Sequence, residues 1–458
     1  MPQLYDVLAH LESDQPAALD RLFELLRIES ISTDPAYKDA CIAAADWLVA
    51  DLQSIGFEAT RRDTPGHPMV VAHSPGEGPR FLFYGHYDVQ PVDPLELWSR
   101  PPFDPAVEET ANGNVIRGRG AGDDKGQLMT FVEACRAYKA VTGGLPANIT
   151  IFLEGEEESG SPSLVPFLEA NREELTADIA FVCDTGMWDA ETPSISTMLR
   201  GMVGEEVTIT AANKDLHSGL YGGPAINPIR VLTRILSNLH DENGRITLPG
   251  FYDGVTEIPD SVKAQWESLG FDADAFLGAV GLSHPAGEGG YSALEQIWAR
   301  PTCEINGING GYTGPGFKTV LPAKAMAKVS FRLVGDQDPD KIQDTFEKYV
   351  RESLPPDCSV KFISKNNAPA TVMPIDAPEF VKAQKALTEE WGKEALFAGG
   401  GGSIPVVGHF REILNMDSLL IGFGLDDDAI HSPNEKYNLT SFQKGARSWA
   451  RILDALTR

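Results

Sequence analysis

Short apolar runs alternate with longer stretches of helical periodicity in the first part of the chain. Apolar residues recur at helical spacing over residues 4–27, 37–56 and 125–140. The apolar runs around these stretches are short enough for buried strands and cover residues 69–73, 80–84, 148–153 and 179–183. Strands that alternate with helices are typical of a mostly parallel sheet with helices on both faces, so the pattern predicts an α/β fold.

The middle of the chain has a different pattern. An amphipathic strand is expected from residue 203, residues 325–333 alternate like a half-exposed strand, and stretches rich in glycine and proline separate them. The α/β pattern returns with an expected helix at 376–391, an apolar run at 417–421 and an expected helix at 440–456. We therefore interpret residues 202–372 as an α+β domain inserted between two parts of the α/β domain, residues 1–201 and 373–458.

Composition narrows the class of protein. The 458 residues are enough for two domains, and the formal net charge is −28 at pH 7. Such a surface repels nucleic-acid phosphates and anionic lipid, so we expect neither nucleic acid nor membrane as a partner. The N-terminus lacks the pattern of a signal peptide, and no apolar run approaches the roughly 18 residues of a transmembrane helix. Five scattered cysteines without a Cys-x-x-Cys pair indicate reduced thiols, so we expect a cytoplasmic protein.

The apolar run at 80–84 leads directly into Gly85-His86-Tyr87-Asp88. Residues i and i+2 of a strand point to the same side, so His86 and Asp88 can reach one cation. The alternative is a capping Asp88 beside a hydrogen-bonded, buried histidine. Buried imidazole and carboxylate groups are costly unless something compensates them, and a divalent cation does so.

Three consecutive glutamates, Glu156 to Glu158, follow the apolar run at 148–153. Adjacent carboxylates point in different directions, so one can bind a metal ion while its neighbour activates water. The alternative interpretation is a solvated acidic turn.

Three further segments carry candidate ligands. The glycine-rich loop Gly118–Gly126 contains Asp123 and Asp124, and its alternative interpretation is a turn in which one of these residues caps a helix. The loop lacks the Gly-Lys-Ser/Thr order of a phosphate-binding loop. Asp184 follows the run at 179–183, and His431 follows the last apolar run.

The candidate ligands follow predicted strands in four of the five segments. In an open α/β sheet, sites form just beyond the carboxyl ends of strands. Two histidines with several carboxylates suit a pair of divalent ions about 3.5–4 Å apart that share a bridging carboxylate. This donor set favours Zn²⁺, with Mn²⁺ or Co²⁺ as alternatives.

The motifs together resemble the M20 metallopeptidase family, most closely its branch of cytosolic dipeptidases of the carnosine-dipeptidase type. They are Gly-His-Tyr-Asp-Val-Gln-Pro, Gly-Arg-Gly-x-x-Asp-Asp-Lys-Gly, Glu-Gly-x-Glu-Glu-Ser-Gly-Ser and Asp-Asp-x-x-His-Ser-x-Asn-Glu, in this order along the chain. The resemblance implies a zinc-exopeptidase-like catalytic domain, with a mostly parallel sheet flanked by helices, and an inserted α+β lid and dimerisation domain. It also implies a cis peptide bond between Asp123 and Asp124.

The resemblance assigns roles in the metal centre residue by residue. His86 would bind one ion and His431 the other, and Asp123 would bridge both. Glu158 would join one of the two metal sites and Asp184 the other. Glu157 matches the general base of the family. Asp88 would orient the His86 imidazole. Glu156 receives no role.

Three residues of the middle and late segments match substrate-side motifs. His217, in Asn213–Gly219, matches a histidine that stabilises the oxyanion in the partner subunit's site, which implies a homodimer; the alternative is an ordinary loop histidine. Arg332 matches an arginine that clamps a substrate carboxylate, with an exposed strand arginine as the alternative. Ser403 lies in a loop that lines the site in relatives. Gly399-Gly400 replaces a charged pair that relatives often have before this loop, which leaves substrate preference there open.

The expected function is metal-dependent hydrolysis of a peptide bond in dipeptides or small peptides with a free C-terminal carboxylate. The alternatives within the family are an N-acyl-amino-acid deacylase and a carboxypeptidase. A catalytically silent metal-binding protein is a third class, but that class usually lacks a ligand or the base, and all are present here.

Overall fold

The computed structural model describes residues 2–364, 367–401 and 404–458, and the chain divides into two compact units. The first unit comprises Met1–Thr197, Met373–Ala398 and His409–Arg458. The second unit comprises Met198–Val372 and Gly399–Gly408. The role of residues 202–372 as a lid stays a prediction.

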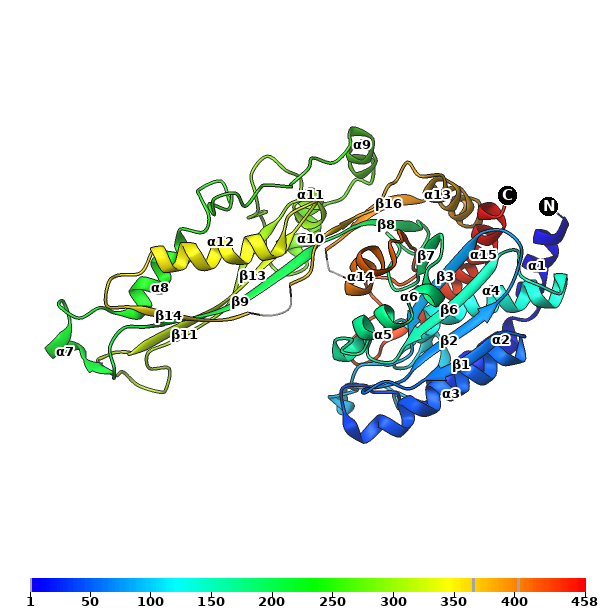
Figure 1. Cartoon of the computed structure of the whole chain (residues 1–458), viewed down its shortest axis with the longest axis horizontal. Helices are drawn as coiled ribbons and strands as arrows, with labels where there is room; N and C mark the ends of the chain where they lie inside the picture. The colour runs from blue at the N-terminus through cyan, green and yellow to red at the C-terminus, as the bar shows by residue number, and fades with distance from the viewer. Residues whose placement is uncertain (1, 365–366, 402–403) are drawn as a thin grey trace. The chain divides into compact units, whose positions relative to one another are not determined.

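The first unit is built on a mixed sheet whose centre is parallel (Figure 1). The strand order is β1 (Glu58–Arg62), β2 (Met69–Ser74), β6 (Asn148–Glu154), β3 (Arg80–His86), β7 (Ile179–Val182), β17 (Ser418–Leu420) and β8 (Ser194–Leu199). β6, β3, β7 and β17 pair in parallel, whereas the pairs on either side of them are antiparallel. The predicted α/β fold class is confirmed, and the parallel order is confined to the centre of the sheet.

Helices cover both faces of this sheet because neighbouring residues of a strand point in opposite directions. Phe83 of β3 stacks on Phe131 of α4 (Lys125–Thr142), and the next residue, Tyr84, contacts Phe410 of α14 (Pro405–Leu414). Phe152 of β6 stacks on Phe167 of α5 (Leu164–Ala170). The other helices of this unit are α1 (Pro2–Ser13), α2 (Gln15–Leu26), α3 (Lys38–Ser54), α6 (Arg172–Leu175), α13 (Pro378–Trp391) and α15 (Leu439–Leu456).

The helix predicted over residues 4–27 is two helices, with a turn at Asp14 between α1 and α2. Pro16 lies in the first turn of α2, where its missing N–H is not needed. The same ring inside a continuous helix would remove a hydrogen bond and clash with the preceding turn, which explains the break.

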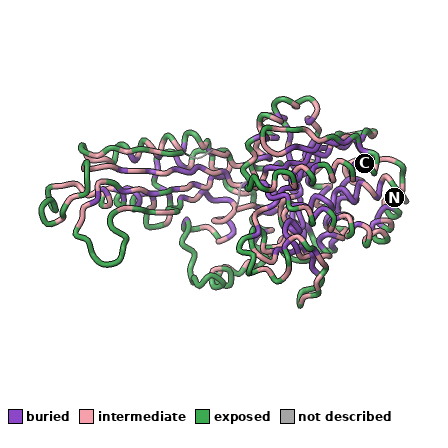
Figure 2. Tube along the Cα trace, turned by 90° about the horizontal axis from the view of Figure 1, so that it is seen from below, coloured by how far each residue is buried: buried purple, intermediate pink, exposed green. Residues whose placement is uncertain are grey.

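A cluster of aromatic side chains forms the core between the sheet and α15. Trp449 of α15 is fully buried and packs against Phe83, Phe131, Phe181 and Phe423. Helices α4 and α15 lie side by side (Figure 1), and the buried parts of the trace concentrate in the body that carries both termini (Figure 2). This core holds the central strands in place beneath their carboxyl ends.

A small antiparallel sheet belongs to the same unit. Its strands are β4 (Ala106–Thr110), β5 (Gly113–Arg117) and β18 (Lys436–Asn438), with β5 in the middle. The pairing of β5 with β18 brings together segments more than 300 positions apart, since Lys436 lies opposite Arg117.

The second unit contains an antiparallel sheet in the order β11 (Thr302–Gly310), β13 (Lys324–Leu333), β9 (Gly201–Thr210) and β14 (Ser359–Ser364). Burial alternates along β13, so one face packs into a core and the other is more exposed. Helices α8 (Pro228–Ser237) and α12 (Pro339–Glu352) contribute to this core. The remaining elements here are β10 (Leu216–His217), α7 (Ser218–Tyr221), α9 (Asp260–Ser268), α10 (Ala273–Gly278), α11 (Ala293–Trp298), β12 (Val320–Leu321) and β15 (Thr371–Val372); β16 (Leu396–Gly400) runs across a unit boundary.

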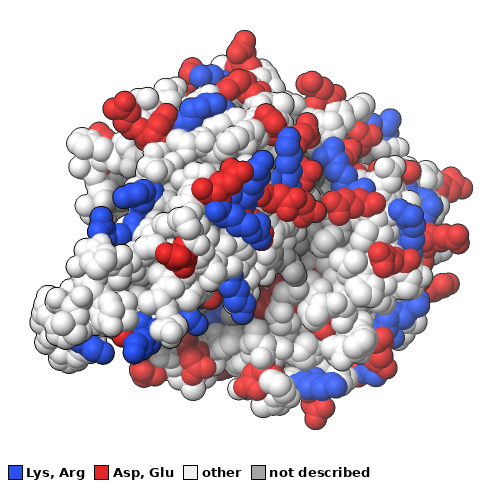
Figure 3. All heavy atoms as spheres, turned by 60° about the vertical axis from the view of Figure 1, so that its left-hand side comes forward, with Lys and Arg blue, Asp and Glu red and all other residues white. Residues whose placement is uncertain are grey.

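Charged side chains of both signs share the surface. On the face drawn in Figure 3, acidic and basic residues are interspersed rather than separated. Among the helices in the described ranges, none has the length and apolarity needed to cross a membrane.

Replacing Trp449 with alanine should lower the free energy of unfolding by about 3–5 kcal/mol, because the change leaves a cavity among four aromatic rings. Urea denaturation followed by circular dichroism measures the effect. Tyr5→Ala is the control, since this aromatic side chain is exposed and its loss should cost less than about 0.5 kcal/mol. Equal effects of the two changes would contradict the central place of Trp449 in the core.

Candidate metal centre

Candidate ligands gather at the carboxyl ends of three adjacent parallel strands. His86 is the last residue of β3, and Asp184 follows the end of β7 by two positions. Glu157 and Glu158 lie in η3 (Glu157–Ser159), a short 3₁₀-helix that follows β6. Because β6, β3 and β7 run in parallel next to one another, their ends meet at one edge of the sheet.

Asp123 reaches the same place from the glycine-rich loop between β5 and α4. Gly126 is required for the tight turn, because a Cβ atom there would lie 2.0 Å from the Ala121 carbonyl oxygen. Gly120 has φ of +81°, a left-handed conformation that side chains disfavour. The expected cis peptide bond between Asp123 and Asp124 is present.

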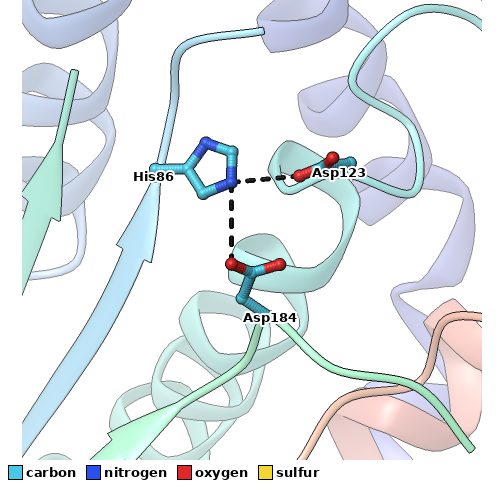
Figure 4. Close-up of side chains that lie close together, drawn as sticks. All are labelled: His86, Asp123 and Asp184. Carbon is cyan, nitrogen blue, oxygen red and sulfur yellow. Dashed lines mark hydrogen bonds and ion pairs between the residues drawn. The ribbon is translucent and has the colours of Figure 1, made fainter. Parts of the chain in front are cut away.

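Two groups of potential ligands share Asp123. In the first, His86 Nε2 lies 3.0 Å from Asp123 Oδ1 and 3.9 Å from Asp184 Oδ2 (Figure 4). In the second, His431 Nε2 lies 2.9 Å from Asp123 Oδ2 and 3.3 Å from Glu158 Oε2. Within each group the ligand atoms lie within 4.8 Å of one another, which is close enough to hold one ion. The two oxygens of Asp123 face different histidines, as a bridging carboxylate requires.

The electrostatics of these groups favour bound positive charge. Burial lowers the pKa of His86, but hydrogen bonds to Asp123 and Asp88 outweigh burial and raise the pKa well above its usual value. Hydrogen bonds to Asp123 and Glu158 raise the pKa of His431 to about 10. Burial, against the opposing effect of His86, raises the pKa of Asp184 well above its usual value. Divalent cations compete with protons for such ligands, and a mixed set of imidazole and carboxylate donors fits Zn²⁺ and similar ions.

Asp88 connects two of the ligand-bearing segments. Its carboxylate accepts hydrogen bonds from the Glu157 and Glu158 backbone N–H groups, at 3.3 and 3.0 Å, and from Ser32 Oγ at 2.6 Å. The same carboxylate lies 3.4 Å from His86 Nδ1. Asp88 therefore lies behind His86 and the η3 turn, where it can set the orientation of both.

Two neighbours of this turn were not assigned from the sequence. Glu156, which had no role, is buried and accepts hydrogen bonds from His67 N at 2.7 Å and Ser163 N at 2.9 Å. Gln90 Nε2 donates to Glu158 Oε2 at 2.6 Å. Gln90 lies in the same motif as His86, and that position was the available signal.

The end of α2 and the segment that follows it also contribute to the centre. Ser30 Oγ donates to the Tyr87 carbonyl at 2.7 Å, and Val89 N donates to the Ser30 carbonyl at 2.9 Å. The buried Lys125, two residues after Asp123, donates from Nζ to the carbonyl of Leu25 and to that of Ile28, at 3.1 and 2.7 Å. No sequence pattern pointed to these long-range contacts.

Glu157 is partly buried beside the ligands. Burial is the main cause that raises its pKa, opposed by His86 and assisted by Glu158 and Asp88. A carboxylate with a raised pKa holds a proton more readily, which is the property that a general base requires.

Two of the three substrate-side candidates belong to the second unit. His217 ends β10 and Arg332 lies on β13, both in the second unit. Their roles at the metal centre stay predictions. Ser403 lies outside the described residues.

Comparisons with known proteins point to one family. The model of Peptidase family M20/M25/M40 matches residues 82–455. The Cys-Gly metallodipeptidase dug1 of Schizosaccharomyces pombe is 30% identical over 100% of this chain and 98% of its own length. The human Beta-Ala-His dipeptidase is 29% identical over 96% of this chain and 87% of its own length. The structure of an M20 family metallo-carboxypeptidase from Sulfolobus solfataricus superposes with a TM-score of 0.82 at 28% identity, over 96% of this chain and 99% of that one.

Replacing Asp123 with alanine should abolish tight binding of both ions, because its two oxygens face both histidines. Equilibrium dialysis against Zn²⁺ with elemental analysis measures the bound metal. The control is Asp426→Ala, which removes an exposed carboxylate from the segment that leads to His431. Two ions bound with unchanged affinity in Asp123→Ala would show that Asp123 is not the bridge.

Proposed function

The chain belongs to peptidase family M20/M25/M40, and from this premise we propose that it is a metal-dependent dipeptidase. It hydrolyses the peptide bond of dipeptides or small peptides that carry a free C-terminal carboxylate. The observation that carries this proposal is Asp123, whose two oxygens face His86 and His431 in two groups of potential ligands. The dipeptidase names of the two similar relatives support the substrate class.

We propose that His86, Asp184 and Asp123 hold one ion and that His431, Glu158 and Asp123 hold the other. Zn²⁺ is the proposed metal, with Mn²⁺ or Co²⁺ as alternatives, because the donor set combines imidazole and carboxylate groups. Once bound by these residues, such ions would lower the pKa of a bound water and polarise the scissile carbonyl.

Glu157 is the proposed general base. It takes the proton of the attacking water and then delivers it to the leaving amine. Its raised pKa and its place directly before Glu158 support this role. Asp88 assists without touching the substrate, since its carboxylate holds the backbone of the η3 turn and lies beside His86 Nδ1.

Arg332 is the proposed binding group for the substrate carboxylate, with Ser403 as a further contact. Among the interactions of the described residues, the half-buried Arg332 side chain has no ion pair or hydrogen bond. Nearby Arg200 donates from Nε to the Gly401 carbonyl at 2.9 Å, and its pKa is lowered to about 10 by burial and by the positive charge of Arg332. Because the positive charge of Arg332 disfavours the charged form of Arg200, an anion beside them would be stabilising, and a carboxylate fits a guanidinium with two hydrogen bonds.

We further propose a homodimer in which His217 stabilises the oxyanion in the partner subunit's site. His217 is exposed, and it lies beside α7, where Leu220 is 76% exposed. Phe317, which precedes the paired strand β12, is 93% exposed. Exposed apolar side chains of this size around the short antiparallel pair of β10 and β12 are typical of a protein interface.

A cytoplasmic location is proposed from the thiols. All five cysteines are free, and four of them are buried. Disulfides form in oxidising compartments, so a chain of this length with only free thiols suits a reducing one.

The second candidate is a carboxypeptidase or N-acyl-amino-acid deacylase, and the similarity to the carboxypeptidase structure favours keeping it. An arginine that binds a C-terminal carboxylate would serve these reactions equally well. A panel of dipeptides, β-alanyl dipeptides, tripeptides and N-acetyl amino acids separates the candidates. Faster hydrolysis of longer peptides or of N-acetyl amino acids would favour the second candidate.

The mechanism predicts that chelation removes hydrolysis and that Zn²⁺, Mn²⁺ or Co²⁺ restores it. Glu157→Ala should retain both ions but lower kcat by several orders of magnitude, because the water loses its proton acceptor. Initial rates on a dipeptide, measured together with metal content, test both statements. Activity that persists in metal-free protein would end this mechanism, and near-normal turnover of Glu157→Ala would remove Glu157 as the base.

Arg332→Met should lower kcat/KM for dipeptides by roughly 10- to 150-fold, since a hydrogen bond to a charged group contributes about 1.5–3 kcal/mol. Dipeptide amides, which lack the carboxylate, should be poor substrates of the wild type and little changed by the substitution. Lys328→Met is the matched control, because Lys328 lies four residues earlier on β13 and its side chain points to the same side of the sheet. A similar loss for both variants would count against a carboxylate site at Arg332.

A further inference from the structure

The carboxylate of Glu435 is fully buried and accepts four hydrogen bonds from the loop that carries Asp123. Glu435 Oε1 accepts from the backbone N–H groups of Gly122 and Asp123, at 2.9 and 3.1 Å. Oε2 accepts from Gly120 N at 3.0 Å and from Arg119 Nη1 at 2.7 Å. Glu435 therefore contacts four residues within a span of five, up to and including Asp123.

The backbone of Glu435 is attached to the same loop. Its carbonyl accepts from Gly118 N at 3.1 Å, and the following residue begins β18, which pairs with β5. The two segments approach so closely that a Cβ atom on Gly122 would lie 3.0 Å from the Lys436 carbonyl oxygen. Glycine at this position lets the carboxylate of Glu435 reach the main chain.

Glu435 also ends the loop that presents His431. This loop is closed by Asp428, whose backbone carbonyl accepts from Lys436 N at 2.9 Å and whose carboxylate lies 2.5 Å from Lys436 Nζ. Ala429 and His431 have φ of +55° and +57°, so the loop depends on these contacts to keep a conformation that side chains disfavour. The loop of His431 and the loop of Asp123 thus meet at one side chain.

We propose that Glu435 is a positioning residue that fixes Asp123 between His86 and His431, and that both metal ions depend on it. This inference rests on the metal ligands proposed above. Asp88 and Gln90 both form hydrogen bonds with Glu158, a proposed ligand of one ion only. The Glu435 carboxylate instead accepts a hydrogen bond from the backbone N–H of Asp123 itself. Because Asp123 is shared by the two groups of ligands, the loss of Glu435 should weaken the binding of both ions rather than of one.

A carboxylate is required at this position because all four partners are donors. A carboxamide of the same shape has one oxygen and one NH₂ group. In either orientation, the NH₂ group of Glu435→Gln would face two N–H donors, so one pair would lose its acceptor. Glu435→Asp keeps the charge beside Arg119, but its shorter side chain cannot hold both pairs at these distances.

The test measures metal affinity rather than activity. Purified full-length wild type and Glu435→Gln are freed of metal and titrated with Zn²⁺ in competition with a chromophoric chelator. Residues that orient ligands typically change metal affinity by about 10- to 100-fold, so we expect a loss of this size for both ions. The rise in melting temperature on adding Zn²⁺ should shrink in the same variant.

Glu390→Gln is the matched control. The Glu390 carboxylate is buried and accepts from Arg447 Nε and Arg451 Nε, each at 2.6 Å, away from the proposed ligands. This change should lower the melting temperature of the metal-free protein but leave Zn²⁺ affinity within about twofold of wild type. An equal loss of affinity in both variants would show that Glu435 acts through general stability, and the proposal would fail.

If Glu435→Gln does not fold, Glu435→Asp is titrated in its place. This variant should show a smaller loss of Zn²⁺ affinity at both sites. Wild-type affinity in a folded Glu435 variant would overturn the proposal. Asp123→Ala, titrated alongside, separates the two levels of inference. If Asp123→Ala loses both ions while the Glu435 variants keep them, only the positioning role fails; if Asp123→Ala keeps both ions, the proposed ligand set fails as well.

Discussion

The carboxylate of Asp123 faces two imidazoles at once, and the local structure of the first unit serves this requirement. One oxygen lies 3.0 Å from His86 and the other 2.9 Å from His431. The two histidines come from segments 345 positions apart, at the end of β3 and after β17. A short carboxylate can meet both only if the backbone that carries it is held from several sides, and the glycine-rich loop, Glu435 and the buried Lys125 provide these attachments.

The same arrangement concentrates negative charge that the fold alone does not neutralise. Burial raises the pKa of Asp184 and that of Glu157, while hydrogen bonds to the surrounding carboxylates raise the pKa of His86 and that of His431, so that these imidazoles bind a proton more readily. Charged groups in such surroundings are stabilised by opposite charge rather than by packing. The sheet beneath is apolar and tightly packed around Trp449, so it gives rigid support to the segments that carry these groups.

The strand ends and their ligand types could be predicted from the sequence, because an apolar run followed by histidine or acid is a local pattern. His86, Asp184 and the η3 glutamates lie at the ends of the expected strands. The contacts that orient them could not be predicted in this way. Ser32 reaches Asp88 across 56 positions, and Glu435 reaches Asp123 across 312, and no local pattern encodes such pairs. The break at Asp14 was missed for another reason, since helical periodicity continues through it and only Pro16 marks the new start.

The hydrogen bonds around Ser30 and Lys125 bear on where the catalytic unit begins. Similarity to the family model starts at residue 82, four positions before His86. Yet Ser30 and Ser32 hold the backbone and side chain that follow His86, and the carbonyl groups of Leu25 and Ile28 receive the buried Lys125. A fragment cut at the start of the matched region would expose these groups and leave a lysine without acceptors in an apolar interior. The start of the family-model match is therefore not the start of the working unit, and the end of α2 with the segment up to Ser32 belongs to the wall of the centre.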